Sequence, residues 1–180
     1  MRGLYKEKQK FSQWWLLGLI LVSTLASVGT LAVGMIQQLI LGKPWGDQPM
    51  SDTGLILVSV MTIAIMGGVL WLIFSMELQI EVHDRAIYYA FLPFIIHLRR
   101  IGIEEIESWE VSMYNPIRDF GGYGMRKSFG RKTAFNIRGN KGLMLKLKSG
   151  KTLLLGTQKP NELRTAIQNE FDKLNDTDFD

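Results

Sequence analysis

The chain has 180 residues with a formal net charge of +4, and 47% of its residues are hydrophobic. It contains no cysteine and only two histidines, which excludes a disulfide framework and a cysteine-based metal site. The hydrophobic residues are unevenly distributed, because two long stretches, Phe11 to Gly42 and Thr53 to Met76, contain no charged residue. The sequence therefore predicts an apolar N-terminal part and a different, compact part after Met76.

The two uncharged stretches predict membrane-spanning helices over about residues 14–36 and 54–74. The hydrocarbon core of a bilayer is about 30 Å thick and needs about 20 helical residues to cross. Apolar residues occupy all sides of both predicted helices, whereas a helix in a soluble core carries a polar face. Four of the five tryptophans lie near the segment ends, where amphipathic rings prefer the membrane interface: Trp14, Trp15, Trp45 and Trp71. We therefore expect an integral membrane hairpin over residues 14–76.

The distribution of lysine and arginine predicts the orientation of this hairpin. Residues 1–13 contain four basic residues against one acidic residue, Glu7, whereas the connection from Gly42 to Asp52 carries Lys43 and two aspartates. Basic residues resume after Met76. Because basic loops stay in the cytoplasm, we expect a protein of the inner (cytoplasmic) membrane with both termini in the cytoplasm. The first apolar segment is longer than a signal-peptide core and a second one follows, which indicates an uncleaved anchor.

After Met76 the pattern changes to that of short strands. Leu78, Ile80 and Val82 alternate with polar residues, which is the period of a strand. The dipeptide Asp84-Arg85 is expected to form a tight turn. The further strands predicted before the last hairpin cover residues 86–91, 94–101, 104–114 and 133–138.

The clearest hairpin in the sequence lies near the C-terminus. Three leucines, at positions 143, 145 and 147, alternate with Met144, Lys146 and Lys148, and residues 151–155 are expected to return as the partner strand. Gly150 suits the turn because it accepts positive φ. From Pro160, which suits a first helical turn, the apolar residues follow helical spacing: Leu163, Ala166, Ile167, Phe171 and Leu174. Residues 77–174 are therefore predicted to form about seven antiparallel strands with a C-terminal helix, followed by an acidic tail, 175–180.

A mainly-β domain of seven antiparallel strands with a C-terminal capping helix is the layout of a pleckstrin-homology-like (PH-like) barrel or sandwich. The chain resembles bacterial membrane proteins that join two transmembrane helices to such a domain. The residues that carry the resemblance are Leu92-Pro93-Phe94, Gly122-Tyr123-Gly124-Met125-Arg126, residues 134–139 and 142–147, Gly150-Lys151, residues 156–160, and Glu162-Leu163. It implies a non-enzymatic binding module and transfers no catalytic residue, since this fold hosts lipid, peptide and protein binding alike.

No constellation of residues in the sequence indicates a reaction. His83 and Asp84 are neighbours in a strand pattern and are expected to face opposite sides. Four glutamates, at positions 104, 105, 107 and 110, are expected to form a solvated edge. The glycines at 122, 124 and 130 lack the strand-before, helix-after context of a phosphate loop. We therefore predict no enzymatic activity, no catalytic residue, no metal and no cofactor.

The basic residues suggest where the domain binds. Residues 126–151 carry nine basic residues and no acidic one. Within them the hairpin 126–132 is a candidate anionic surface site, in which an aromatic plug is flanked by cations: Arg126, Lys127, Phe129, Arg131 and Lys132. The alternative to this lipid-sensing role is a solvated hairpin, and nucleic acid is not expected as a partner.

The favoured function is therefore a binding or scaffold module that docks a protein partner near the bilayer, for example by strand addition at an exposed sheet edge. Binding of anionic membrane lipid by the hairpin 126–132 is the alternative. Self-association through the transmembrane hairpin is a further option, because the pair Gly67-Gly68 in the second segment is expected to allow close packing against Gly29 and Gly34 in the first.

Overall fold

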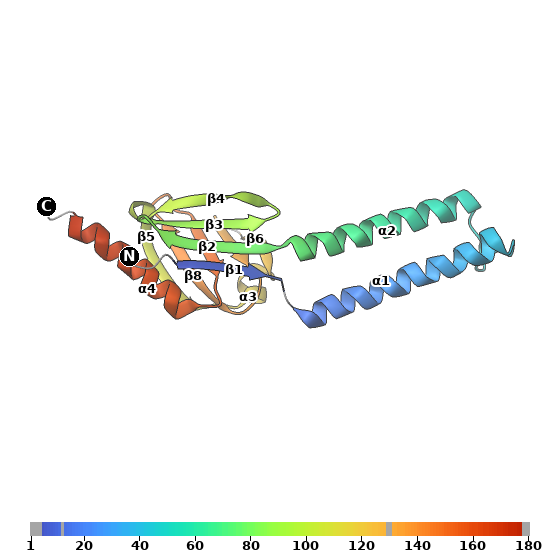
Figure 1. The fold of residues 1–180 in the computed structure, drawn as a ribbon, viewed down its shortest axis with the longest axis horizontal. Helices are drawn as coiled ribbons and strands as arrows, with labels where there is room; N and C mark the ends of the chain where they lie inside the picture. The colour runs from blue at the N-terminus through green and yellow to red at the C-terminus, as the bar shows by residue number, and fades with distance from the viewer. Residues whose placement is uncertain (1–4, 12, 129–130, 178–180) are drawn as a thin grey trace. The chain divides into compact units, whose positions relative to one another are not determined.

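The computed structural model describes residues 5–11, 13–128 and 131–177, and the chain divides into two units. Residues 12–74 form a helical unit. Residues 1–11 combine with residues 75–180 in the other unit, which contains every strand that the structure describes. Figure 1 shows the elements of both units, coloured along the chain.

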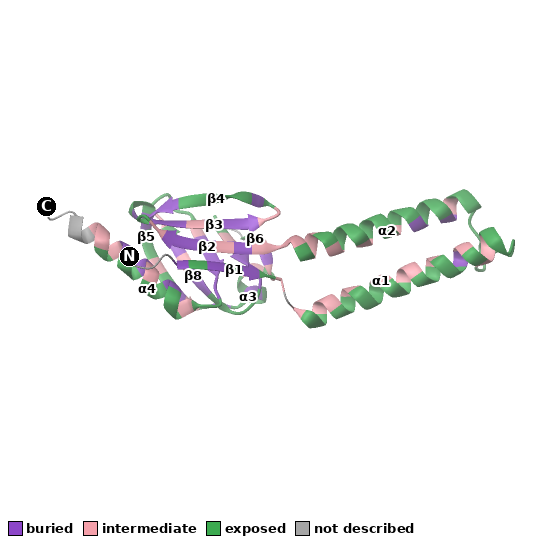
Figure 2. Cartoon of the chain, in the orientation of Figure 1, coloured by how far each residue is buried: buried purple, intermediate pink, exposed green. Residues whose placement is uncertain are grey.

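The helical unit contains two long apolar helices. They are α1 (Trp14–Met35), which continues into a π-helical turn (Ile36–Ile40), and α2 (Asp52–Ser75). Each is long and apolar enough to cross a membrane, and most of their side chains are exposed (Figure 2). The hydroxyls of Thr24 and Ser59 donate to carbonyls of their own helices at 2.8 Å, so these polar groups are satisfied locally.

The glycines of the helical unit do not pack as expected. A Cβ added at Gly29, Gly67 or Gly68 meets no described atom within 4 Å, so these residues make no close contact between α1 and α2. Gly34 packs instead against the indole of Trp45, whose ring atoms would lie 2.6 Å from an added Cβ. The predicted close helix contact at these glycines is therefore wrong within one chain.

The first sheet has four antiparallel strands in the order β1-β2-β3-β4. They are β1 (Tyr5–Lys10), β2 (Glu77–His83), β3 (Ala86–Leu92) and β4 (Ile95–Gly102). The predicted strands 77–83, 86–91 and 94–101 are confirmed within one or two residues. The turn between β2 and β3 is also confirmed, with positive φ at Asp84 and Arg85.

Strand β1 was not expected. The sequence predicts a basic extension over residues 1–13, whereas β1 pairs with β2 over its whole length, from Tyr5–Val82 to Lys10–Glu77. The backbone N–H of Phe11 also donates to the carbonyl of Met76 at 3.4 Å. The helical hairpin is therefore an insertion between two neighbouring strands of one sheet.

The second sheet has five strands in the order β5-β8-β9-β7-β6. They are β5 (Ile106–Met113), β6 (Gly124–Ser128), β7 (Lys132–Asn136), β8 (Lys141–Leu147) and β9 (Thr152–Gly156). A 3-10 turn (Ile103–Glu105) precedes β5, and a short helix α3 (Pro116–Phe120) follows it. The hairpin β8–β9 is confirmed, with positive φ at Gly150.

The prediction of a mainly-β domain followed by a C-terminal helix is confirmed, but the predicted count of about seven strands and their all-antiparallel pairing are wrong. The described part of the chain has nine strands in two open sheets and no closed barrel. The strands β7 and β9 are parallel. The hairpin β6–β7 does not pair with β5, which precedes it in the chain, and lies instead beside β9 at the other edge of the sheet.

The two sheets share one core, which α4 (Pro160–Thr177) closes. Aromatic rings from both sheets meet there, with Phe91 of β3 5.6 Å from Phe135 of β7. Leu163 and Ile167 of α4 are fully buried, as their helical spacing predicted. Glu170, the polar residue on that face, is also buried, and its carboxylate accepts the backbone N–H of Arg85 at 2.8 Å.

Candidate functional site

Each open sheet ends in two edge strands, whose outer backbone groups are available to a partner. These edges are β1 and β4 in the first sheet and β5 and β6 in the second. The edge of β5 contacts α4. The guanidinium of Arg164 donates to the carbonyl of Val111 at 2.7 Å, and the rings of Trp109 and Phe171 lie 5.8 Å apart. These contacts of α4 cover part of the β5 edge.

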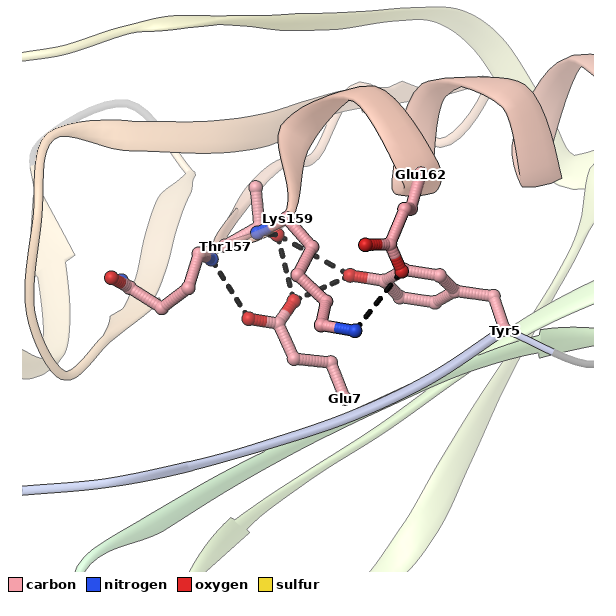
Figure 3. A network of polar contacts seen from close by, with 6 residues as sticks. Tyr5, Glu7, Thr157, Lys159 and Glu162 are labelled. Atoms are coloured by element: carbon pink, nitrogen blue, oxygen red, sulfur yellow. Dashed lines mark hydrogen bonds and ion pairs between the residues drawn. The ribbon is translucent and has the colours of Figure 1, made fainter.

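Strand β1 is held by a buried polar network (Figure 3). The carboxylate of Glu7 accepts the hydroxyls of Tyr5 at 2.5 Å and of Thr157 at 2.7 Å, and the backbone N–H of Gln158 at 2.8 Å. Thr157 in turn accepts the N–H of Lys159 at 2.9 Å, just before α4 begins. Burial, and then the hydrogen bond to Glu7, raise the pKa of Tyr5 above its usual range.

This network has a structural role. Glu7 is 5% exposed and forms no ion pair with a described cation, so its charge is balanced by the three donors alone. An open groove of about 640 Å³ lies beside it, lined by Tyr5, Lys6, Lys159 and polar residues of α4. Lys159 is paired there with Glu162 at 3.0 Å. The carboxylate of Glu7 is therefore hidden and saturated, and the charged groups that line the groove are those of Lys6, Lys159 and Glu162.

Strand β4 presents apolar side chains to solvent. Ile96 is 70% exposed, and Phe94 and Leu98 are also exposed. Within the described chain, β4 pairs only with β3, and no other backbone hydrogen bond is formed by residues 95–101. In Figure 1 it is the outermost strand of its sheet. We define Phe94, Ile96 and Leu98 as the β4 patch.

A bulge explains why the β4 patch protrudes. Phe91 pairs with Ile95 and Tyr89 pairs with Arg99, so three residues of β4 stand opposite Ala90 alone. Extra residues in one strand bend it and redirect its side chains. The sequence could not indicate this exposure, because the continuous apolar run from Phe94 to Ile96 is equally typical of a fully buried strand.

Basic residues adjoin the β4 patch. His97, Arg99 and Arg100 are exposed, and residues 94–102 contain no carboxylate. Arg100 is paired with Glu104 at 3.2 Å, whereas neither His97 nor Arg99 forms an ion pair with a carboxylate in the described chain. Burial raises the pKa of Tyr89, and the neighbouring Arg99 opposes that shift. The patch is therefore apolar with a positive margin.

The basic hairpin does not gather its candidate residues at one point. Arg126 and Lys127 are successive residues of β6 and face opposite sides. The guanidinium of Arg126 donates to the carbonyl of Tyr123 at 3.0 Å, beside the glycine-rich loop. Arg131 and Lys132 lie at the turn, where the carbonyl of Arg131 accepts the N–H of Thr152 at 3.2 Å. Phe129, the proposed aromatic plug, lies outside the described residues.

The turn of the hairpin β6–β7 follows one end of β6, and Gly124 lies at the other end, beside Met76, the residue before β2. A Cβ on Gly124, the first residue of β6, would lie 3.4 Å from Met76. The turn is a strand length further on, about 13 Å at about 3.3 Å per residue. Lys148 and Lys151 of the β8–β9 connection are exposed near the same turn, since Lys132 pairs with Thr152.

The other polar candidates are accounted for by local contacts. The four glutamates at 104, 105, 107 and 110 are exposed, as expected, and Glu107 pairs with Lys146 at 2.7 Å. His83 and Asp84 do converge, at 2.8 Å, because Asp84 lies in the turn and not in the strand as assumed. In the residues that the structure describes, no group of three His, Cys, Asp or Glu has the arrangement of a metal site.

A second buried polar cluster lies on the far face of the second sheet. The ring of Tyr114 packs over Gly142 and Gly156, and its hydroxyl and the fully buried Asn136 side chain have no hydrogen-bond partner among the described residues. Burial raises the pKa of Tyr114 to about 12.

Residues 4–173 match the sequence model of DUF6141, a family of unknown function. The chain belongs to this family. The DUF6141 match runs from the start of β1 through both long helices into α4, so the inserted hairpin and the sheets belong to one family unit. No curated protein matches the chain, and no solved structure does.

Proposed function

We propose that this DUF6141 protein is a membrane-anchored, non-enzymatic docking module that binds an extended segment of a protein partner along β4. The proposal rests on the β4 patch, because its apolar side chains are exposed at the edge of a sheet. The edge of β5 is partly covered by α4, β1 carries three lysines and the polar network, and β6 carries Arg126 and Lys127.

The unpaired backbone of β4 favours a protein over lipid as the occupant. Open sheet edges are not stable in hydrocarbon, because each unsatisfied N–H or C=O costs several kcal/mol there. A polypeptide segment offers both apolar side chains for Ile96 and Leu98 and backbone groups for the strand.

We also propose that the domain is PH-like. When the hairpin β6–β7 is set aside, seven antiparallel strands remain, four in one sheet and β5, β8 and β9 in the other, followed by α4. This is the layout that the sequence resemblance implies, with β1 as its first strand. In this proposal the helical hairpin is inserted after the first strand, and the hairpin β6–β7 after the fifth.

The pairing of β1 with β2 supports a membrane hairpin with both outer ends on one side. Strand β1 leads into α1, and α2 leads into β2. Because β1 and β2 pair in one sheet, the chain between them must cross the membrane an even number of times. The lysine and arginine bias favours the cytoplasm as that side. Three of these lysines, at positions 6, 8 and 10, also pair with Glu81 or Glu77 of β2.

Thiol labelling tests this orientation, because the chain contains no cysteine. We expect Gly46→Cys, in the connection between the helices, to react with a membrane-impermeant maleimide in intact cells. Ser149→Cys, in the β8–β9 turn, should react only after the cells are opened. Labelling of Ser149→Cys in intact cells would overturn the proposed orientation.

A photo-crosslinking amino acid at Ile96 tests the docking function in cells. Ile117 on α3 is the matched control, because it is the same residue type and is 71% exposed. We expect a discrete protein adduct from position 96 and none from position 117. Equal adducts from both positions would contradict a docking role for β4.

Anionic lipid binding by the basic hairpin is the second candidate. It is favoured by the four described cations, Arg126, Lys127, Arg131 and Lys132, none of which pairs with a described carboxylate. The same crosslinker placed at Lys127 distinguishes the two functions. Lipid adducts at position 127 without protein adducts at position 96 would favour this second candidate.

A further inference from the structure

We propose that the segment bound along β4 alternates apolar and acidic residues. This inference rests on the proposed function and concerns the chemistry of its partner. It follows from the order of the apolar and basic side chains that are exposed along β4.

Apolar and basic side chains alternate in sequence from Ile96 to Arg99, and all four residues are exposed. Arg99 lies on the face of Tyr89, its partner in β3, whereas Ile96, His97 and Leu98 form the bulge opposite Ala90. An extended segment beside β4 therefore meets apolar and basic residues in turn.

Apolar residues of the segment would cover Ile96 and Leu98. Phe94 forms one end of the β4 patch. Its ring stacks on that of Phe91, with 6.3 Å between the ring centroids. Burial of such side chains supplies the main part of the affinity.

Acidic residues of the segment would meet Arg99 and His97. Arg99 has no carboxylate partner in the described chain, in contrast to Arg100 beside it, which Glu104 already neutralises. A basic segment at this position would meet repulsion from Arg99, and like charges at an interface cost several kcal/mol. The charge of Arg99 therefore determines which partner binds, and the apolar contacts of Ile96 and Leu98 supply most of the affinity.

Fluorescent peptides tested on the full chain in uncharged detergent measure this selection. The probes are short peptides of alternating valine and glutamate, valine and serine, or valine and lysine. We expect the glutamate peptide to bind at least about tenfold more tightly than the lysine peptide. Arg99→Glu should reverse this order, whereas Arg118→Glu, the same charge change at an exposed site on α3, should leave it unchanged.

The outcomes separate the two proposals. Equal binding of the three peptides, lost on Ile96→Lys, would refute the acidic partner and leave docking at β4 in place. Binding of none of the peptides together with an absence of crosslinks at position 96 would refute docking itself. A preference for glutamate that persists in Arg99→Glu would refute the role of Arg99.

Discussion

Excision of the helical hairpin is expected to leave a soluble, folded domain. Residues 12–75 are replaced by an Asn-Gly turn that joins Phe11 to Met76, whose backbones are already hydrogen bonded. Asn-Gly suits a two-residue hairpin turn with the twist of antiparallel strands. All described strands and the shared core lie in the unit that remains. The excised protein should elute as a monomer and unfold cooperatively in urea, followed by the fluorescence of its single tryptophan, Trp109.

The control for this experiment is the fragment from Glu77 to Asp180, which lacks β1. It loses the buried side chains of Tyr5, Glu7 and Gln9 and exposes the edge of β2. A domain of this size has a total stability of about 5–15 kcal/mol, so we expect the fragment to aggregate or to unfold at a much lower urea concentration. Equal stability of the two proteins would show that β1 is dispensable.

The failure to predict β1 has a physical cause. Strand prediction relies on alternating apolar residues, but the buried face of β1 is formed by Tyr5, Glu7 and Gln9. Only one of the three looks apolar in the sequence. The burial of the other two depends on partners near residue 157, at the opposite end of the chain, which no local pattern reveals. The strands of the hairpin β8–β9 were predictable because leucines alone form their inner faces.

The candidate sites show the same limit. The apolar residues Phe94, Ile96 and Leu98 were visible in the sequence, but a run of this kind indicates a strand without indicating which side of it is covered. The exposure of the β4 patch depends on the bulge opposite Ala90 and on the position of β4 at the edge of its sheet. The basic hairpin was visible as a charge cluster, yet the strand geometry sends Arg126 and Lys127 to opposite faces.

Replacement of Glu7 by alanine is expected to destabilise the domain by about 3 kcal/mol. It leaves the Tyr5 hydroxyl, the Thr157 hydroxyl and the Gln158 N–H without their acceptor, and hydrogen bonds to a charged group contribute about 1.5–3 kcal/mol each without adding fully. Glu110→Ala is the matched control, since Glu110 is an exposed glutamate of β5 and such changes are usually within about 0.5 kcal/mol of neutral. Urea denaturation of the excised domain, or thermal denaturation of the full chain in detergent, measures the difference. If the two substitutions had equal effects, the buried carboxylate would not be what ties β1 to the start of α4, and β1 would be held by the β1–β2 ladder alone.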